Sequence, residues 1–453
     1  MLINSRTVAW QTGLAAVLAG SAVVLGGGGS PAPLSELALQ CLTAVLVMLW
    51  IVTAQANTPL VRVHRDVWII AGMVLILPIL QLIPLPPAVW QSFKGRELQQ
   101  AALALVDAQD TWRPLSLLPT RTFASLLAMV PAVVMLIMVA SLKRGGRAAV
   151  VGVVSVMAAL SLVIGAGQIA AGEGNAFRFY DQDIGFLNGF QANHNSTADV
   201  LMVAMLGVAA TIREMSAYSQ RWRPTPAYRL SLTFGACVLF CFGVFLTASR
   251  MGMMLLPVAL LGVLWMVWPL LKFNRGTLVI IGWLALLLVV AAGYLAATNP
   301  VVVKVLSRFD FAGEYRPQIW RETLHAIGVY FPWGSGMGTF VPVYAAGELL
   351  ETVGPTYANR AHNDLLELLL EGGVIGAMLL TGVVWTVLAS ARQAITKPPA
   401  GSPGQVVFAI TVLGVIALHS QVDYPLRSMS LALVAAMCVG LLIPVVDTGR
   451  RRG

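Results

Sequence analysis

Residues 361–390 decide the fold class, and they read AHNDLLELLLEGGVIGAMLLTGVVWTVLAS. A short polar start leads into an apolar run longer than about 18 residues, which is the length at which a stretch becomes a candidate transmembrane helix. Comparable runs recur from one end of the chain to the other. The chain is 58% hydrophobic and 11% charged, whereas soluble domains carry about 25% charged residues. The sequence therefore predicts an all-α polytopic membrane protein.

The apolar runs predict about twelve transmembrane helices. The predicted spans are residues 7–26, 34–55, 67–86, 122–142, 148–171, 196–212, 230–247, 250–271, 277–297, 364–390, 405–420 and 427–446. The first run resembles a signal peptide, but the Gly- and Pro-rich stretch after it has no clear small-x-small cleavage site. A second span starts almost at once, so the first run is interpreted as a span.

Lys and Arg residues in the loops set the orientation of a membrane protein. With the N-terminus in the cytoplasm, every cytoplasmic segment is net basic, including Lys143–Arg147, Arg213–Arg229 and Arg450–Arg452. This distribution explains the net charge of +9 without nucleic acid as a partner. Both termini are therefore predicted to be cytoplasmic, and the working surface is predicted to lie on the opposite face.

Two long segments fall on the non-cytoplasmic side. Residues 87–121 mix Leu and Ala with charged residues, which predicts an amphipathic helix on the membrane surface. Residues 298–363 form the larger loop, between the ninth and tenth spans. We take residues 1–180 as an N-terminal set of transmembrane helices and residues 181–453 as the region that carries this loop. Polar residues near hydrocarbon are costly and often functional, and most of the histidines lie on this side.

His362 is the sharpest catalytic candidate, because it stands where a polar loop turns into a span. Asn363 can cap the start of that helix, and Asp364, Glu367 and Glu371 fall on one of its faces. A histidine that meets the aqueous side while partly desolvated suits a general base near neutral pH. A loop histidine that only caps or packs is equally compatible with the spacing.

Arginines supply the candidates for binding phosphate. Arg250 follows Thr247–Ser249 in the outer hairpin between the seventh and eighth spans, and Arg316 and Arg321 lie in the large loop. A guanidinium at the membrane surface suits a phosphate or pyrophosphate. The alternative for Arg250 is an interfacial anchor, and the alternative for Arg321 is a loop salt bridge.

Three further polar segments allow more than one interpretation. Asn193 and His194 belong to a cluster just before the sixth span, where they either bind sugar or cap the helix. The glycine-rich residues 334–338 follow no strand, so a tight turn is favoured over a nucleotide loop. His419 and Asp423 are four residues apart and would touch on a helix, and a structural ion pair is favoured over the wall of a site.

These residues together resemble the signature of the O-antigen ligase family, which also contains polysaccharide polymerases and bacterial protein O-oligosaccharyltransferases. The family's His-Asn-x9-Gly-x-x-Gly pattern lies at His362, Asn363, Gly373 and Gly376, its Ser-Arg hairpin at Thr247–Arg250, its Arg…Trp…Pro…Gly-x-Gly-x-Gly loop at Arg316–Gly338, and its closing His-Ser-x-x-Asp segment at His419–Arg427. The resemblance covers about residues 186–442. The first 180 residues match only as spans.

The resemblance implies a GT-C-like glycosyltransferase of the bacterial inner membrane. Its donor would be a glycan on undecaprenyl pyrophosphate at the periplasmic face, and its acceptor would be lipid A–core or a growing glycan. A histidine at the place of His362 would deprotonate the acceptor hydroxyl, and arginines at the places of Arg250 and Arg316 would hold the pyrophosphate. The reaction would invert the anomeric carbon and use no metal or cofactor. The possible substrate-binding residues are Asn193, His194, Arg321, Asn363 and Glu367.

The motifs leave several functions open. A ligase that moves a finished glycan onto lipid A–core, a polymerase that joins repeat units and a protein O-glycosylation enzyme all share this chemistry. A transporter or flippase is the rival of another class, but the sequence shows no paired interrupted spans in two related halves. A structural scaffold would not need Arg250, Arg316 and His362 on one side. The sequence therefore favours a glycosyltransferase of this chemistry, and the ligase is taken as the first candidate.

Overall fold

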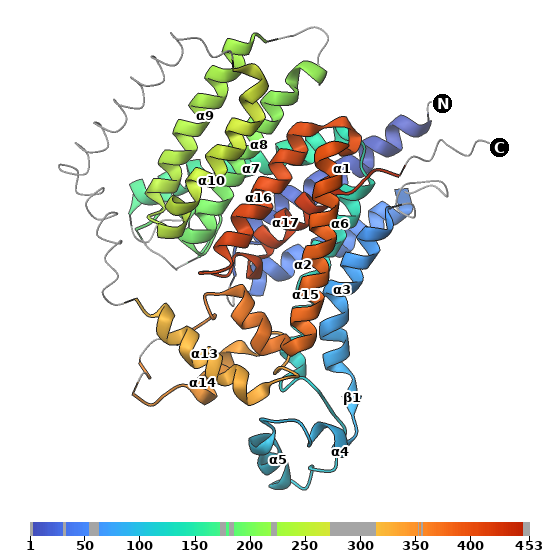
Figure 1. Ribbon diagram of the computed structural model, residues 1–453, viewed down its shortest axis with the longest axis vertical. Coiled ribbons are helices and arrows are strands. Elements are labelled where there is room, and N and C mark those ends of the chain that lie inside the picture. The colour runs from blue at the N-terminus through green and yellow to red at the C-terminus, as the bar shows by residue number, and fades with distance from the viewer. Residues whose placement is uncertain are drawn as a thin grey trace. The chain divides into compact units, whose positions relative to one another are not determined.

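A computed structural model of the chain is almost entirely helical (Figure 1). It describes residues 3–29, 33–53, 63–172, 178–180, 185–218, 224–271, 314–351, 353–354 and 357–446. The chain divides into two compact units, the first made of Met1–Val153 with Tyr315–Gly453 and the second of Val154–Glu314. Over the described residues the all-α class is confirmed. The predicted division of the chain into residues 1–180 and 181–453 was made along the sequence, and it stays a prediction.

The first unit brings the C-terminal third of the chain onto the N-terminal helices. Its elements are α1 (Ile3–Leu25), α2 (Pro33–Thr53), α3 (Arg65–Leu82), β1 (Pro84–Leu85), α4 (Pro87–Trp90), α5 (Glu97–Ala104), β2 (Arg113–Pro114), α6 (Pro119–Ser141), the start of α7 (Arg144–Ala171), α13 (Arg316–Tyr330), α14 (Phe340–Gly347), α15 (Asp364–Thr396), η3 (Pro399–Gly401), α16 (Pro403–His419), η4 (Pro425–Arg427) and α17 (Met429–Leu442). α6 packs against α3 and α17, and α15 packs against α3 and α13. An apolar core that includes Ile327, Phe340, Tyr344 and Leu370 joins α13, α14 and α15. The start of α15 is therefore held by the segment that precedes it, which contains α13 and α14.

The second unit is a small helical bundle. It contains the rest of α7, together with α8 (His194–Tyr218), α9 (Pro226–Leu246), α10 (Arg250–Val267) and η2 (Trp268–Leu270). α8 packs against both α9 and α10. A Cβ atom on Gly243 would lie 3.0 Å from the Leu201 side chain, and one on Gly252 would lie 2.4 Å from the Ala198 Cβ. Small residues thus allow the helices to approach closely, as is common inside membranes.

Eight described helices are long and apolar enough to cross a membrane. They are Leu34–Val52 of α2, α3, α6, α7, His194–Glu214 of α8, α9, Arg250–Leu270 and α15. Three shorter apolar helices, Ala9–Leu25 within α1, α16 and α17, coincide with the predicted spans 7–26, 405–420 and 427–446. The remaining predicted span, 277–297, lies outside the described residues. The polytopic membrane class is confirmed, while the total of twelve spans and the GT-C-like arrangement stay predictions.

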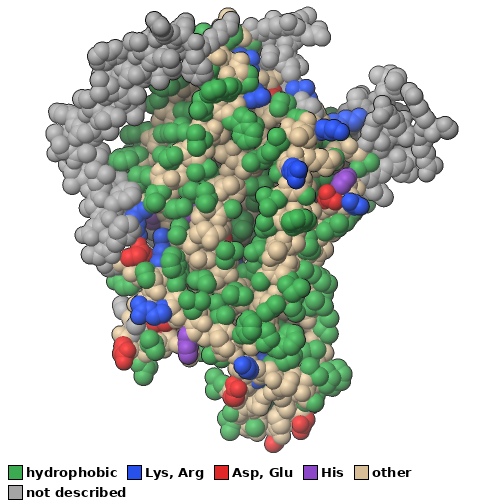
Figure 2. Space-filling model, in the orientation of Figure 1, with side chains coloured by type: hydrophobic (Ala, Val, Ile, Leu, Met, Phe, Trp, Pro, Cys, Tyr) green, Lys and Arg blue, Asp and Glu red, His purple; other side chains and the backbone are tan. Residues whose placement is uncertain are grey.

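Large apolar side chains are exposed along the flanks of these helices, and Figure 2 shows hydrophobic side chains over much of the visible face. Val52, Met378 and Trp385 are 80%, 68% and 75% exposed. Exposed apolar surface on this scale is unusual for a protein in water. Lipid tails solvate such side chains, and helices satisfy their backbone hydrogen bonds internally except at their ends. The described surface is therefore that of a protein embedded in a bilayer.

Residues 87–121 do not form the single amphipathic helix that their composition predicted. They fold as the short helices α4 and α5, and β2 pairs with β1 in an antiparallel ribbon. Trp90 is buried and donates a hydrogen bond from Nε1 to the Thr111 carbonyl oxygen at 3.0 Å. Arg96 is also buried and donates to the Leu115 carbonyl oxygen. The prediction is wrong because these polar contacts fold the segment back on itself as a small lobe.

Arg147 joins the C-terminal ends of two helices. Its side chain is fully buried and donates hydrogen bonds of 2.9–3.1 Å to the carbonyl oxygens of Ala140, Leu142, Leu441 and Ile443. These carbonyls lie at the ends of α6 and α17, where a helix has no partners for its last carbonyl groups and carries partial negative charge. Arg147 therefore caps both helices and ties them together.

We expect Arg147→Met to destabilise the protein strongly. The substitution leaves several buried carbonyl groups without donors, and each such group costs about 1–3 kcal/mol. The unfolding temperature in detergent, followed by tryptophan fluorescence, should fall by about 5 °C or more. Arg65→Met is the control, because that side chain is 85% exposed. Equal unfolding temperatures for the two variants would contradict the capping role.

Candidate functional site

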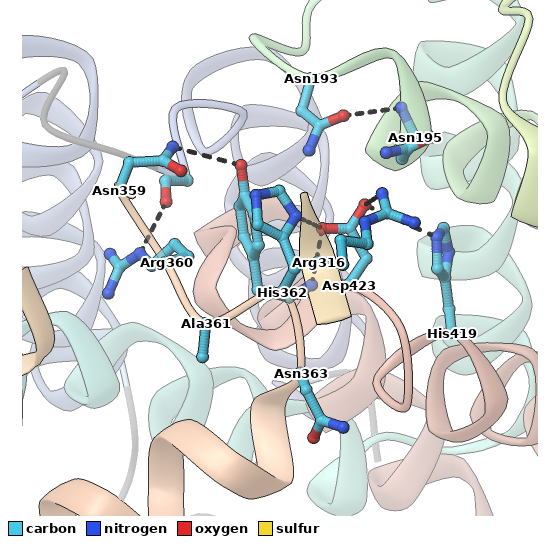
Figure 3. Close-up of polar contacts among 12 residues, drawn as sticks. Asn193, Asn195, Arg316, Asn359, Arg360, Ala361, His362, Asn363, His419 and Asp423 are labelled. Carbon is cyan, nitrogen blue, oxygen red and sulfur yellow. Dashed lines mark hydrogen bonds and ion pairs between the residues drawn. The ribbon is translucent and has the colours of Figure 1, made fainter. Parts of the chain in front are cut away.

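His362 lies at the end of the loop that leads into α15 (Figure 3). Its backbone is left-handed, with φ 48°, a conformation that costs a residue other than glycine about 1–3 kcal/mol. Asn363 caps α15, because its Oδ1 accepts hydrogen bonds from the backbone N–H groups of Leu365 and Leu366, each at 3.0 Å. Trp320 Nε1 donates to the His362 carbonyl oxygen at 3.3 Å. The turn and the cap hold His362 immediately outside the helix.

Asp423 is the partner of the His362 ring. The two side chains approach to 3.1 Å between His362 Nδ1 and Asp423 Oδ1, and the Asp423 side chain is only 3% exposed. Burial alone would raise the pKa of Asp423, but the hydrogen bond with His362 and the nearby charges of His362, His419 and Arg316 hold it well below its usual range. Asp423 is therefore ionised at neutral pH.

The charge of Asp423 fixes the orientation of the imidazole. An ionised carboxylate only accepts hydrogen bonds, so a neutral His362 ring carries its proton on Nδ1 and its lone pair on Nε2. The ring is 23% exposed and packs edge-on against Tyr424, with ring centroids 4.9 Å apart. An imidazole held in this way can accept a proton through Nε2.

We expect Asp423 to contribute to stability only above acid pH. Its pKa is lower in the folded protein than the value of about 3.9 in an unfolded chain. Its contribution is therefore complete above about pH 4 and is lost as the pH falls through the folded pKa. The difference in unfolding temperature between wild type and Asp423→Asn should shrink as the pH falls below about pH 4. A difference that stays the same down to about pH 2 would contradict this.

Two more basic side chains lie close to the Asp423 carboxylate. Arg316, the first residue of α13, places Nη2 3.6 Å from Asp423 Oδ2, and His419 Nε2 lies 3.9 Å from the same oxygen. Arg316 is 21% exposed, whereas His419 is fully buried. The candidate base and one candidate pyrophosphate ligand thus meet at a single carboxylate (Figure 3). A guanidinium has five N–H donors, so this contact is compatible with binding a phosphate.

Arg250 begins α10 in the second unit. The connection from α9 is tight, since Ala248 has φ 53° and Ser249 Oγ accepts a hydrogen bond from the Gly252 N–H at 3.0 Å. The predicted hairpin is therefore present. Arg250 forms an ion pair with Glu314, and each of these side chains is 19% exposed. A partly exposed guanidinium at a helix N-terminus suits an anion, and its role toward pyrophosphate stays a prediction.

Asn193 and His194 lie at the start of α8, also in the second unit. Asn193 Oδ1 accepts a hydrogen bond from the Asn195 N–H at 2.8 Å. His194 is 7% exposed, and its ring centroid lies 4.9 Å from that of Phe186. These contacts fit the capping alternative for the cluster. A role in sugar binding stays a prediction.

The other proposed substrate-binding residues differ in their accessibility. Arg321 is exposed on α13. Asn363 caps α15 through Oδ1 and donates from Nδ2 to a backbone carbonyl at 2.8 Å. Glu367 is fully buried, and its carboxylate accepts from Arg360 Nη1 at 3.0 Å and from the Ala361 N–H at 3.1 Å. Of the three, only Arg321 is exposed.

The glycine-rich residues 334–338 pack against α15. All three of their glycines have positive φ, which favours glycine. The Ser335 N–H donates to the Leu370 carbonyl oxygen and the Gly336 N–H to the Glu371 carbonyl oxygen, each at 2.9 Å. The predicted tight turn is confirmed, and these two backbone N–H groups bind α15.

We expect Gly334→Ala to disturb this packing. Gly334 has φ 81°, and a Cβ atom there would lie 2.5 Å from the Glu371 carbonyl oxygen and 2.7 Å from the Gly373 nitrogen. Both atoms belong to the backbone of α15, so the helix must shift, and the unfolding temperature should fall by several degrees. Gly328→Ala on α13 is the matched control, because its Cβ would meet nothing within 4 Å. A Gly334→Ala protein as stable as this control would contradict the close approach.

Sequence reasoning missed the contacts of Asp423 with His362 and Arg316, and the basic partners of the acidic face of α15. Two features of the sequence could have indicated these contacts: the spacing of His419 and Asp423, and the rule that buried carboxylates need cations.

Among the described residues, no three His, Cys, Asp or Glu side chains are grouped so that they could hold a metal ion.

Comparison with known families bears directly on this site. Residues 235–381 match the model of the O-antigen ligase family. This segment of the chain is O-antigen ligase-like. No curated protein matches the chain. The O-antigen ligase-like segment contains Arg250, Arg316 and His362, begins after Asn193 and ends before Asp423. Members of this family are glycosyltransferase-like ligases and polymerases, so the expected family resemblance is confirmed.

Proposed function

We propose that the chain is a glycosyltransferase of the bacterial inner membrane that works at its periplasmic face. It moves a glycan from undecaprenyl pyrophosphate to an acceptor hydroxyl, with lipid A–core as the acceptor. The observation that carries the proposal is the contact of Asp423 with both His362 and Arg316, two residues of the O-antigen ligase-like segment. A base and a phosphate-binding cation at one place are the two groups that this reaction needs.

In the proposed reaction, His362 removes the proton of the acceptor hydroxyl. The proton moves to His362 Nε2, while the hydroxyl oxygen attacks the anomeric carbon of the donor glycan. The bond from that carbon to the pyrophosphate oxygen breaks, and undecaprenyl pyrophosphate leaves. Asp423 stabilises the resulting imidazolium, which then loses its proton to water. Attack on the face opposite the leaving group inverts the anomeric configuration.

The leaving group carries the largest change in charge. Arg316 and Arg250 offset the negative charge that develops on the pyrophosphate, so the reaction requires neither a metal ion nor a cofactor. Arg321 is exposed near the start of α13 and contributes to holding the donor. Asn363 and Glu367 act inside the protein, since their side chains already hold the turn at His362. Asn193 and His194 contribute to a sugar subsite.

A polymerase of the same family is the second candidate. The match to the family supports a ligase and a polymerase equally, because the two differ only in the acceptor. A flippase would move the same lipid-linked glycan without breaking its bond to pyrophosphate. A flippase breaks no bond and needs no general base, so it does not explain the pairing of His362 with Asp423.

The experiment uses purified protein in proteoliposomes with a radiolabelled undecaprenyl-pyrophosphate glycan, lipid A–core and a chelator. The product is analysed for the size of its glycan and for its lipid anchor. The proposal predicts labelled glycan on lipid A–core at the size of the donor glycan. Longer glycans that remain on undecaprenyl pyrophosphate would replace the ligase by the polymerase. Donor that is never consumed would contradict both enzymes.

A further inference from the structure

Three carboxylates on one face of α15 are buried next to the His362 loop. Asp364, Glu367 and Glu371 are 7%, 0% and 0% exposed. A buried carboxylate is costly unless cations and hydrogen bonds compensate it. The proposed reaction uses none of the three as an acid or a base, so their burial calls for another explanation.

Arg427 is the cation that all three carboxylates share. Its Nη1 lies 2.9 Å from Glu371 Oε2, and its Nε lies 3.4 Å from Glu367 Oε1 and 3.8 Å from Asp364 Oδ1. An arginine guanidinium stays charged at any physiological pH, so Arg427 offsets the charge of these carboxylates. The planar, forked guanidinium reaches carboxylates on successive turns of α15, which a lysine ammonium cannot reproduce.

The same cluster holds the backbone on one side of His362. Glu367 Oε1 lies 3.0 Å from Arg360 Nη1, and Glu367 Oε2 accepts a hydrogen bond from the Ala361 N–H at 3.1 Å. Arg360 and Ala361 directly precede His362, whose backbone is left-handed. Glu367 therefore fixes the turn from which the imidazole projects.

The cluster also holds the loop that carries Asp423. Asp364 Oδ2 accepts a hydrogen bond from Ser420 Oγ at 2.8 Å and from the Leu426 N–H at 3.2 Å. Asp423 lies between these two residues, and Arg427 follows directly after Leu426. One face of α15 thus fixes both the segment that carries the base and the segment that carries its carboxylate partner.

We propose that Arg427 and the acidic face of α15 form a clasp that sets the distance between His362 and Asp423. Arg427 is then a positioning residue, which acts through this pair and does not touch the substrate. The inference rests on the proposed function only for its effect on turnover. The contacts that make up the clasp do not depend on the identity of the glycan or of the acceptor.

The decisive variant is Arg427→Lys, which keeps the positive charge and removes the forked guanidinium. The transfer assay is run on wild type, Arg427→Lys, Asp423→Asn and the double variant. We expect Arg427→Lys to lower kcat by about 30-fold or more, because misplacement by about 1 Å can cost about 100-fold. The donor KM should change by less than about threefold, since the clasp does not bind the donor. The double variant should be no slower than Asp423→Asn alone, because both changes act on the same contact.

Two more variants keep this experiment interpretable. Glu367→Gln keeps the size of the side chain and removes its charge, so it tests the clasp if Arg427→Lys folds poorly in a thermal melt. Arg392→Lys, at an exposed position on α15, is the matched control and should keep wild-type turnover. Wild-type kcat in both clasp variants would overturn the proposal. So would losses that multiply in the double variant.

A second readout is independent of catalysis. Nitrogen NMR of labelled histidine, with the His362 signals assigned by their loss in His362→Gln, reports which ring nitrogen carries the proton. We expect protonated Nδ1 in wild type and a mixture of tautomers in Arg427→Lys. Unchanged His362 signals in Arg427→Lys would overturn the clasp even if the enzyme proves inactive. Changed signals without any glycan transfer by wild type would reject the proposed function and leave the clasp standing.

Discussion

His362→Gln should abolish nearly all glycan transfer. Glutamine keeps a polar side chain at this position but cannot accept a proton from a hydroxyl at neutral pH. The loss of a general base lowers turnover by about 10²–10⁴-fold. The donor should still bind, because the proposed mechanism assigns pyrophosphate binding to arginines and not to His362. The measurement is kcat in proteoliposomes, together with donor binding measured directly.

The matched control is His325→Gln. His325 is exposed on α13, a helix of the same unit, and the mechanism gives it no role. Its variant should retain turnover within about twofold of wild type. If His362→Gln and His325→Gln transfer glycan at the same rate, His362 is not the base.

Asp423→Asn should lower kcat almost as far as the loss of the base itself. An asparagine amide can donate to His362 Nδ1, which would place the ring proton on Nε2, the nitrogen that must accept the acceptor's proton. We expect a loss of about 10²–10⁴-fold in a protein that still folds, because the two side chains have nearly the same size. The measurement is kcat, with the unfolding temperature at neutral pH measured alongside.

The control for Asp423→Asn is Asp110→Asn, which makes the same chemical change at an exposed position. It should leave turnover unchanged. Combining Asp423→Asn with His362→Gln should add little to the loss caused by His362→Gln alone, since the carboxylate acts through the ring. Losses that multiply would show that Asp423 works elsewhere.

The membrane-spanning helices could be predicted from the sequence because long apolar runs have few alternatives. A run such as residues 122–142 must either span a bilayer or be buried, and its composition alone limits the choice. The lobe at residues 87–121 could not be predicted in the same way. Its shape depends on where the Trp90 and Arg96 side chains find carbonyl partners, and periodicity carries no information about such contacts.

The candidate base could also be identified from the sequence, since His362 stands at a change from polar loop to apolar helix. Its surroundings could not, because they join segments far apart in the chain. Asp423 lies 61 residues from His362 along the sequence, and spacing connected it only to His419. The acidic face of α15 was visible from its helical spacing, but its partner Arg427 was not, because that pairing depends on how the last two helices return to α15.

Arg147 illustrates the same limit at another place. Its position among basic loop residues contributed to the prediction of a cytoplasmic segment, yet the loop pattern gives no reason for it to be buried. Only the packing of α6 against α17 brings four carbonyl oxygens to its guanidinium. A single residue can thus satisfy a topological rule and a structural requirement that is independent of it.

The most direct test of the proposed chemistry measures undecaprenyl pyrophosphate released for each glycan transferred. Proteoliposomes receive a donor labelled on both its lipid and its glycan, together with lipid A–core, and both labels are followed for wild type and His362→Gln. We predict one undecaprenyl pyrophosphate for each glycan that reaches lipid A–core in wild type, and almost none of either product in the variant. A donor that crosses the bilayer with both labels still joined, equally in the two proteins, would contradict glycosyl transfer and identify a flippase.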